Sequence, residues 1–421
     1  MRWFLLMGWL LVFGWFGARA GESAAFVEVD ETTTVAAPKP SALALRYHWT
    51  GNVIWGAARV WDVAAPLVLL ATGASVRLRN VARRVGKGWF LEVGIYVTLF
   101  LVIVYLADLP LRFYAGFVRQ HAYGLSRQTV GKWLGDSLKG LGVDLVGGFC
   151  FAWVPFYLIK RWPRWWWLIT GGLTVPFAAF VMLIAPVWID PLFHEFGPMK
   201  DKGLEAKILA LASRAGIPAE RVFEVNMSVD TKTANAYVKG LLGTQRIVLW
   251  DTLVKNFDER EVLAVMGHEM GHYVLGHIGW SLGLSSIVVV AGLFWTDRAG
   301  RWVLRKYGGR LGIDSLADVA AAPLLLVLLG LSSAALGPVA LAYSRYQEHE
   351  ADRFALELTH MNRSAARAFA DFQRENLGVP RPGMFYRIWR STHPSIAARI
   401  SFCNSYHPWV GGEKGLENLG E

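Results

Sequence analysis

Long apolar runs separated by short polar loops dominate the chain. Six of these runs come close to, or exceed, the about 20 residues with which an α-helix crosses the apolar core of a membrane. They cover residues 60–76, 89–107, 141–159, 165–189, 278–296 and 319–343. Pro176 and Pro338 lie inside two of the runs, and membrane helices tolerate proline there. The pattern predicts a mainly α-helical, polytopic membrane protein.

The N-terminus carries a shorter apolar run with different flanks. Arg2 precedes "WFLLMGWLLVFGWFG", residues 3–17, and an Ala-x-Ala cleavage pattern follows. This order is typical of a signal peptide over residues 1–20, and an uncleaved first transmembrane helix is the alternative. Residues 21–58 form a polar segment, of which we expect residues 21–45 to be flexible.

Two polar blocks interrupt the apolar pattern. In residues 190–277, "GLEAKILALASRAGI" predicts a helix, and "TANAYV" and "RIVLW" around a glycine-containing turn predict a β-hairpin. The block ends with "DEREVLAVMGHEMGHYVLGH", which we expect to be one helix. Residues 344–421 are mostly helical and polar in pattern.

Composition agrees with a membrane protein. Of the 421 residues, 54% are hydrophobic and only 18% are charged, against about 25% charged in soluble domains. The net charge of +10 does not indicate a nucleic-acid partner, because the basic residues cluster in short loops beside apolar runs. Two cysteines exclude both a disulfide framework and a cysteine-based zinc site.

The basic loops also predict an orientation. The loops 77–87, 160–164 and 297–318 are rich in arginine and lysine, and helix counting places them on one side. The positive-inside rule makes that side cytoplasmic. Residues 190–277 and the C-terminal segment would then face the extracytoplasmic side. The loop 108–140 also holds five basic residues, but it is longer and contains acids.

The chemistry concentrates in "HEMGH". His268 and His272 are four residues apart, so on a helix their imidazoles share one face and can bind one metal ion. With Glu269 they form the H-E-x-x-H zinc signature, in which the glutamate is the general base. On a continuous helix His277 would lie about 140° away from His272, so we expect it to be an interface or hydrogen-bonding residue.

A catalytic zinc site needs a third protein ligand and an open position for water. An antiparallel return of the last apolar run would bring "SRYQEHEADRFALEL", residues 344–358, back to the histidines. Spacing alone leaves several side chains of this stretch open as ligands: Glu348, His349, Glu350 and Asp352. One carboxylate of the Glu348–Asp352 pair can bind zinc while the other orients a zinc histidine.

Six motifs in order resemble the type I CAAX prenyl proteases, which are integral-membrane zinc metalloproteases. They are "LPLRFYAGFVRQHAYGLSRQT", "IDPLFHEFGPM", "NAYVKGLLGTQRIVLWDTLV", "HEMGHYVLGH", "SRYQEHEADRFA" and "STHPSIAARI". The resemblance runs from about residue 60 to residue 405. It implies a barrel of seven helices around a water-filled chamber, of which the N-terminal segment would be the seventh.

The resemblance also implies roles for individual residues. Glu348 becomes the third ligand of one zinc ion per chain, Asp352 its supporting carboxylate, and His393 the stabiliser of the oxyanion. Arg399 matches a family arginine, for which a substrate contact and a helix-capping salt bridge are both open.

Asn235, Ala236 and Tyr237 match the strand that holds the substrate backbone. A simple core hairpin is the alternative for that strand.

The expected architecture is therefore a polytopic helical membrane protein with a small α+β, gluzincin-like zinc metalloprotease domain at the membrane face. Its parts are residues 1–20 (signal peptide or first transmembrane helix), 21–58 (polar extracytoplasmic segment), 59–189 (four transmembrane helices), 190–277 (protease domain with the zinc motif), 278–343 (two further transmembrane helices) and 344–421 (C-terminal part of the protease domain). The expected location is a bacterial cell membrane.

The expected activity is zinc-dependent hydrolysis of a peptide or protein substrate, lipidated or not, among membrane lipids. A membrane quality-control zinc protease of the heat-shock type would share every catalytic residue. The alternative from another class is a non-catalytic membrane scaffold stabilised by zinc, whose metal site four protein ligands would close.

Overall fold

The computed structural model describes residues 30–239 and 246–411. The predicted signal peptide or first transmembrane helix, 1–20, lies outside the described residues. So does the turn of the predicted hairpin.

Six helical segments of the described chain are long and apolar enough to cross a membrane, as the sequence predicted. They are α1 (Ala42–Ala71), α3 (Trp89–Phe113) continued by η1 (Tyr114–Val118) and α4 (Arg119–Ala122), α5 (Val130–Phe151) with α6 (Trp153–Arg161), α7 (Trp166–Ile184) continued by η2 (Ala185–Ile189) and η3 (Asp190–Leu192), α11 (His277–Leu311), and η5 (Val319–Ala321) with α12 (Ala322–Thr359).

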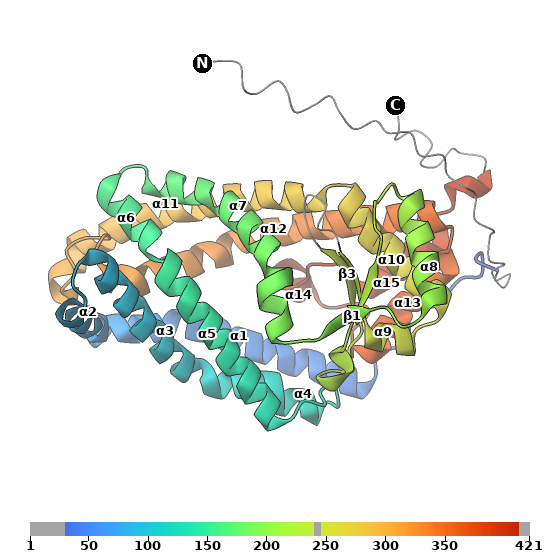
Figure 1. Cartoon of the computed structure of the whole chain (residues 1–421), viewed down its shortest axis with the longest axis horizontal. Coiled ribbons are helices and arrows are strands. Elements are labelled where there is room, and N and C mark those ends of the chain that lie inside the picture. Colours follow the sequence, from blue (N-terminus) through green and yellow to red (C-terminus); the bar gives the residue numbers. More distant parts are fainter. Residues whose placement is uncertain (1–29, 240–245, 412–421) are drawn as a thin grey trace, which may run out of the picture. The chain divides into compact units, whose positions relative to one another are not determined.

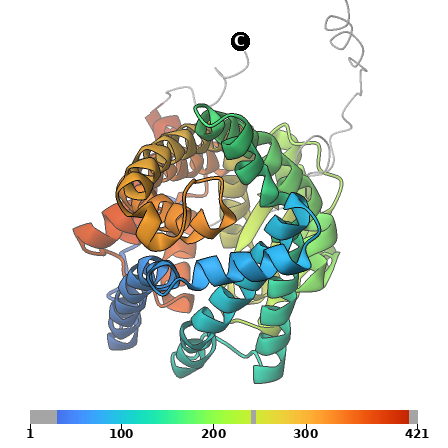
Figure 2. The same ribbon diagram turned by 90° about the vertical axis from the view of Figure 1, so that its left-hand side faces the viewer.

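The six segments close a ring. In the order α1, α3, α5 with α6, α7, α11 and α12, each contacts the next, and α12 contacts α1. The view along the helices shows this circular order (Figure 2). It agrees with the barrel implied by the resemblance, while the proposed seventh helix lies outside the described residues.

The first predicted span, 60–76, is wrong at both ends. Helix α1 begins at Ala42, where Ser41 caps it by accepting a hydrogen bond from the Ala44 N–H at 3.0 Å. It ends before Gly73, whose φ of 67° breaks the helix. The polar residues in the first turns of α1 hid its start. Helix α2 (Ala74–Val85) follows the break.

A four-stranded sheet lies at one end of the long helices (Figure 1). Its order is β1-β2-β4-β3, with β1 antiparallel to β2, β2 parallel to β4, and β3 antiparallel to β4. The predicted hairpin is confirmed as β3 and β4. The strands are β1 (Phe196–Pro198), β2 (Val222–Val225), β3 (Ala236–Lys239) and β4 (Arg246–Trp250).

Helices pack around this sheet and build one core with it (Figure 1). They are α8 (Lys202–Arg214), α9 (Asp251–Asn256), α10 (Glu259–Val274), α13 (Asn362–Glu375), α15 (Ile396–Ser405) and η6 (Pro408–Gly411). Outside this core, η4 (Met227–Val229) contacts α9, and α14 (Met384–Trp389) contacts α12. The end of α12 belongs to the same core. The protease-like part is therefore assembled from two stretches of sequence separated by a pair of membrane helices.

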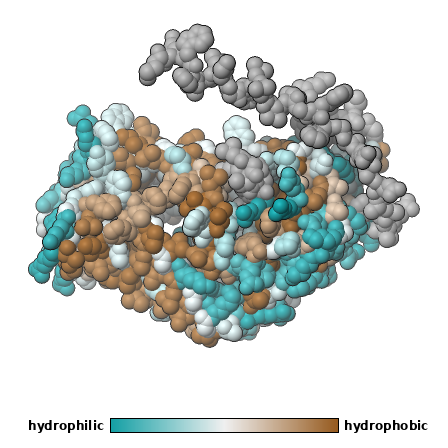
Figure 3. Space-filling model, viewed as in Figure 1, coloured by the Kyte–Doolittle hydropathy of each residue, from teal (hydrophilic) through white to brown (hydrophobic). Residues whose placement is uncertain are grey.

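The surface of the long helices differs in polarity from the surface of the sheet and its helices. In Figure 3 apolar surface covers the long helices, and hydrophilic surface covers the sheet and its helices. A second hydrophilic surface lies at the opposite end, where α2 is found. This arrangement fits a membrane-spanning bundle with a polar domain at one face.

Candidate metal centre

Helix α10 presents the two histidines of the motif side by side. Its N-terminus is fixed by a capping box, in which Asp258 and Glu261 satisfy each other's backbone N–H groups. One turn separates His268 from His272, and their Nε2 atoms lie 3.1 Å apart. Most of α10 is buried, so its register against the core holds these side chains in place.

Helix α12 supplies the third group, Glu348. Its Oε2 lies 3.3 Å from His268 Nε2, and its Oε1 lies 3.4 Å from His272 Nε2. The three potential ligand atoms all lie within 4.8 Å of one another. Glu348 Oε2 is buried and has no hydrogen-bond donor among the described residues. Two imidazoles and a carboxylate that meet in this way fit a catalytic zinc ion.

The neighbouring candidates of α12 point elsewhere. His349 packs its ring 4.5 Å from that of Phe402, and Glu350 pairs with Arg353 at 2.7 Å. Of the four side chains that spacing left open, Glu348 is the one that joins His268 and His272 in a group of described residues able to hold a metal ion.

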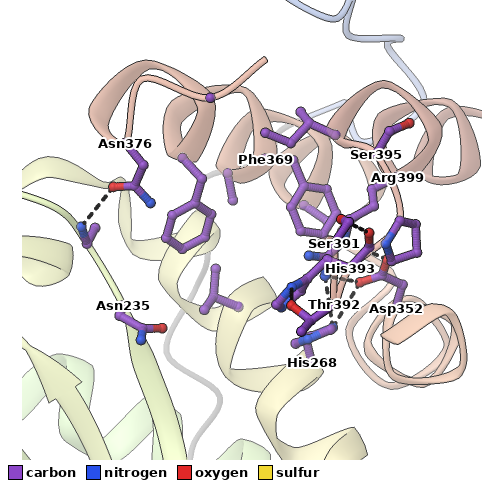
Figure 4. A pocket seen from close by; sticks show the side chains of 18 of the residues that line it. Asn235, His268, Asp352, Phe369, Asn376, Ser391, Thr392, His393, Ser395 and Arg399 are labelled. Atoms are coloured by element: carbon purple, nitrogen blue, oxygen red, sulfur yellow. Dashed lines mark hydrogen bonds and ion pairs between the residues drawn. The ribbon is translucent and has the colours of Figure 1, made fainter. Parts of the chain in front are cut away.

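Asp352 lies behind the histidines. Its Oδ1 is 2.9 Å from His268 Nδ1, so the carboxylate can orient the ring and fix its tautomer. Arg399 of α15 holds Asp352 with two contacts, at 2.8 and 2.5 Å, and stacks at 3.9 Å over Phe369 (Figure 4). Arg399 therefore forms a salt bridge, as one of its two predicted roles required, but its partner lies inside α12 and not at a helix end.

Glu269 and His393 face the metal-binding side chains from the cavity. Burial raises the pKa of Glu269, and no described residue donates a hydrogen bond to its carboxylate. His393 Nε2 lies 3.3 Å from Glu348 Oε1, and its Nδ1 contacts Thr392 Oγ1 at 2.7 Å. Burial lowers the pKa of His393, which favours the neutral imidazole.

His277 does not continue the helix that carries His268 and His272, although the sequence predicted one helix. Helix α10 ends at Val274, and Gly276 has a φ of 64°. The chain turns there, and His277 Nδ1 comes within 2.8 Å of His272 Nδ1. The predicted hydrogen-bonding role fits this contact, but the predicted continuous helix is wrong. A glycine just after a helix is a known stop signal and could have revealed the break.

A cavity of about 600 Å³ opens beside these groups. Asn235 lines it at the start of β3, opposite His393 and Arg399 (Figure 4). Ala236 is buried and Tyr237 is half-buried, and neither lines the cavity.

Among the lining residues that sequence reasoning missed are Tyr47, Tyr386 and Arg390. They come from α1 and from the segment around α14, and no local motif marks them.

Comparisons with known proteins agree with this geometry. A family model described as peptidase family M48 matches residues 198–406. A second model, described as the CAAX prenyl protease N-terminal domain with five membrane helices, matches residues 54–195. The chain is 24% identical to the crystal structure of S. mikatae Ste24p, with a TM-score of 0.75 over 87% of this chain and 92% of that one, so the folds are alike.

Curated relatives match over most of their length. The chain is 37% identical to the Bacillus subtilis protein named "Uncharacterized metalloprotease YhfN", over 93% of this chain and 92% of the relative. It is 30% identical to CAAX prenyl protease 1 of Saccharomyces cerevisiae, over 70% of this chain and 68% of the relative. The chain therefore belongs to peptidase family M48, as an integral-membrane metallopeptidase similar to the CAAX prenyl proteases.

Proposed function

We propose that this chain is a zinc metalloendopeptidase that cuts peptide substrates in the cavity beside the membrane, with Glu269 as the general base. One observation carries the proposal. The ligand atoms of His268, His272 and Glu348 converge within 4.8 Å, and Glu269 lines the cavity next to them. These three side chains would hold one zinc ion and leave a further position open.

Three residues around the metal site have different roles in the proposed reaction. A zinc ion, when bound, supplies Lewis acidity and lowers the pKa of a bound water. Glu269 accepts the proton of the attacking water and passes it to the leaving amine. His393 donates a hydrogen bond to the carbonyl oxygen as negative charge develops on it. Asp352 keeps the ring of His268 oriented throughout, because it contacts the opposite nitrogen.

The substrate backbone can pair with β3. This strand lies at the edge of the sheet, and an edge strand offers unpaired backbone groups to an extended peptide. Asn235 leads from the cavity into β3, so a peptide along Asn235, Ala236 and Tyr237 would reach the metal-binding side chains. Arg399 would contribute indirectly, by holding Asp352.

The relatives named CAAX prenyl protease 1 suggest a prenylated C-terminal peptide as the substrate. The first test is hydrolysis of a fluorogenic farnesylated C-terminal peptide by the purified protein in detergent, beside the unprenylated peptide and a chelator control. We expect metal-dependent cleavage that favours the prenylated peptide. Equal cleavage of both peptides would instead favour a quality-control protease.

Glu269→Gln is the variant that tests the mechanism. An amide of the same shape cannot accept the proton, so we expect cleavage to fall by about 10²–10⁴-fold. The bound zinc, measured by atomic emission, should be unchanged because Glu269 is not one of the three ligands. Glu350→Gln is the matched control, since Glu350 pairs with Arg353 and should keep full activity.

A zinc-stabilised scaffold would give a different result. Glu269 would then have no chemical task, and no peptide would be cut by wild type or variant. Near wild-type cleavage by Glu269→Gln would exclude the proposed general base while leaving the peptidase assignment in place.

A further inference from the structure

Arg390, at the end of α14, is an arginine of the cavity wall without an acidic partner. It lines the cavity next to Ser391, Thr392 and His393. Its Nη1 donates a hydrogen bond to Asn52 Oδ1. A guanidinium has five N–H donors, and no described residue accepts from the other four. Arginines are rarely buried unless they are paired, and Arg390 is half-buried with no carboxylate partner among the described residues.

Aromatic rings hold this guanidinium in place. Its Cζ lies 5.0 Å from the ring centre of Tyr386 and 5.7 Å from that of Trp55. With the hydrogen bond to Asn52, these contacts fix the side chain between α14 and α1. Arg390 is therefore positioned in advance and is not a freely moving surface arginine.

A second unpaired arginine strengthens the positive charge. Arg119 is only 8% exposed, donates a hydrogen bond to the Tyr47 carbonyl at 2.6 Å, and stacks at 3.7 Å on the Tyr47 ring. No carboxylate of the described chain forms an ion pair with it. Burial lowers the pKa of Arg390, and the charge of Arg119 acts in the same direction.

The second arginine of the cavity wall, in contrast, has a carboxylate partner. Arg399 also lines the cavity, but Asp352 neutralises that guanidinium through two contacts. Of the two arginines that line the cavity, only Arg390 offers its charge to a ligand. Away from the metal-binding side chains, an anionic group entering the cavity would find its complementary partner there.

Arg390 stands at a suitable distance from the metal-binding side chains. It precedes His393 by three residues, and His393 Nε2 lies 3.3 Å from Glu348 Oε1. Three residues of extended chain span at most about 11 Å. A substrate tail of about the same length could therefore reach from a peptide bond at the metal site to Arg390.

We propose that Arg390 binds the α-carboxylate of the substrate's C-terminal residue, a few residues beyond the bond that is cut. The guanidinium fork matches the two carboxylate oxygens. This inference rests on the proposed peptidase function and adds its specificity: the enzyme selects a free C-terminus close to the cleavage site. An internal segment of a long chain brings no such group to Arg390.

Binding tests the proposal separately from cleavage. The probe is a fluorescent peptide that ends in S-farnesylcysteine and three further residues, prepared as the free acid and as the C-terminal amide. Its binding to the Glu269→Gln protein, loaded with zinc, is measured by fluorescence anisotropy. Charge-assisted hydrogen bonds predict that the acid binds about 10- to 100-fold tighter than the amide.

Variants in the same Glu269→Gln background assign this preference to Arg390. Arg390→Gln should reduce the acid-to-amide ratio to near one, and Arg390→Lys should retain part of it. Asn52→Asp replaces the amide by a carboxylate of the same shape, which would pair with Arg390 permanently. This variant should therefore also lower the acid-to-amide ratio, although Arg390 stays in place. Arg387→Gln is the control, because Arg387 lies one turn earlier in α14 and does not line the cavity.

Three binding results would overturn the proposal. Equal binding of acid and amide by the Glu269→Gln protein overturns the proposal, and so does a preference that survives Arg390→Gln. An amidated peptide whose last residue is aspartate, if bound as tightly as the acid, assigns Arg390 to a side-chain carboxylate instead and overturns the α-carboxylate assignment. None of these results depends on turnover, so failure of the peptidase function would show itself separately in the cleavage assay.

Discussion

His268 is held by partners on both sides of its imidazole ring. Nε2 faces Glu348 and His272, while Nδ1 contacts Asp352 Oδ1 at 2.9 Å. Removing the charge of such a supporting carboxylate lowers metal affinity by about 10- to 100-fold in comparable sites. We therefore expect Asp352→Asn to lose zinc at a lower chelator concentration than the wild type, with metal content measured after dialysis against graded chelator.

Two variants control this prediction. Glu350→Gln removes a carboxylate two residues away that pairs with Arg353, and it should retain zinc normally. Glu348→Gln removes a direct ligand and should lose zinc more completely than Asp352→Asn. Identical zinc retention by Asp352→Asn and the wild type would show that Asp352 does not support the site.

The site residues differed in how far the sequence could predict them. His268, Glu269 and His272 could be predicted from their spacing, because one turn of any helix brings side chains with this spacing together. Glu348 and Asp352 occupy one face of α12 with the same spacing, so spacing could not decide which of them faces His272. That choice depends on how α12 is rotated against α10, which is a property of packing. Arg390 had no local signal at all.

At the scale of elements, the crossing of α10 and α12 decides where Glu348 lies. Two glycines of α10 let the helices approach closely. A Cβ added at Gly271 would lie 3.2 Å from the Ala351 backbone, and one at Gly267 would lie 3.0 Å from Thr359 Cγ2. A larger side chain there must push α12 away, and Glu348 would move with it.

We accordingly predict that Gly271→Val lowers both stability and zinc retention. Overpacking of a close contact costs about 1–3 kcal/mol, measured here as a lower Tm in detergent. Gly330→Val is the matched control within α12, because a Cβ at Gly330 meets no atom within 4 Å. If Gly271→Val kept its Tm and its zinc, the close approach would not be what positions Glu348.

The helix ends show why some boundaries escaped prediction. The run of His-rich and apolar residues from α10 into α11 carries continuous helical periodicity, yet Gly276 divides it. Periodicity could not reveal the break, because two helices that meet at a glycine preserve much of the pattern. The start of α1 was missed because its polar residues interrupt the apolar run. Thr50 and Asn52 accept hydrogen bonds from Arg119 and Arg390.

At the scale of the whole bundle, the three basic segments meet at one end, as helix counting predicted. The prediction of loops is wrong for most of 77–87 and 297–318, because α2 and the end of α11 make these residues helical. Arg79 donates to the Gly312 carbonyl at 3.2 Å and so joins the first of these segments to the third. Arg301 reaches the Pro163 carbonyl in the loop before α7. This end lies opposite the sheet (Figure 1). The ring order of the helices could not be predicted from the sequence, because it depends on which apolar faces pack together.

Clustering of the basic loops leads to the prediction about orientation. The positive-inside rule places the end with α2 in the cytoplasm and the metal centre on the extracytoplasmic side. Two exposed, uncharged positions report the two ends without altering the charge: Val85 in α2 and Ser213 in α8. Each is changed to cysteine in a background in which Cys150 and Cys403 are alanine.

A maleimide that cannot cross membranes then distinguishes the two ends. In bacterial spheroplasts we expect the Ser213→Cys protein to be labelled and the Val85→Cys protein to be protected, and in inverted vesicles the reverse. The opposite pattern would put the metal centre in the cytoplasm, where a substrate would be a cytosolic C-terminus instead of an exported one. Because Arg390 would select a free C-terminus in either compartment, the labelling result decides which set of proteins can supply that terminus.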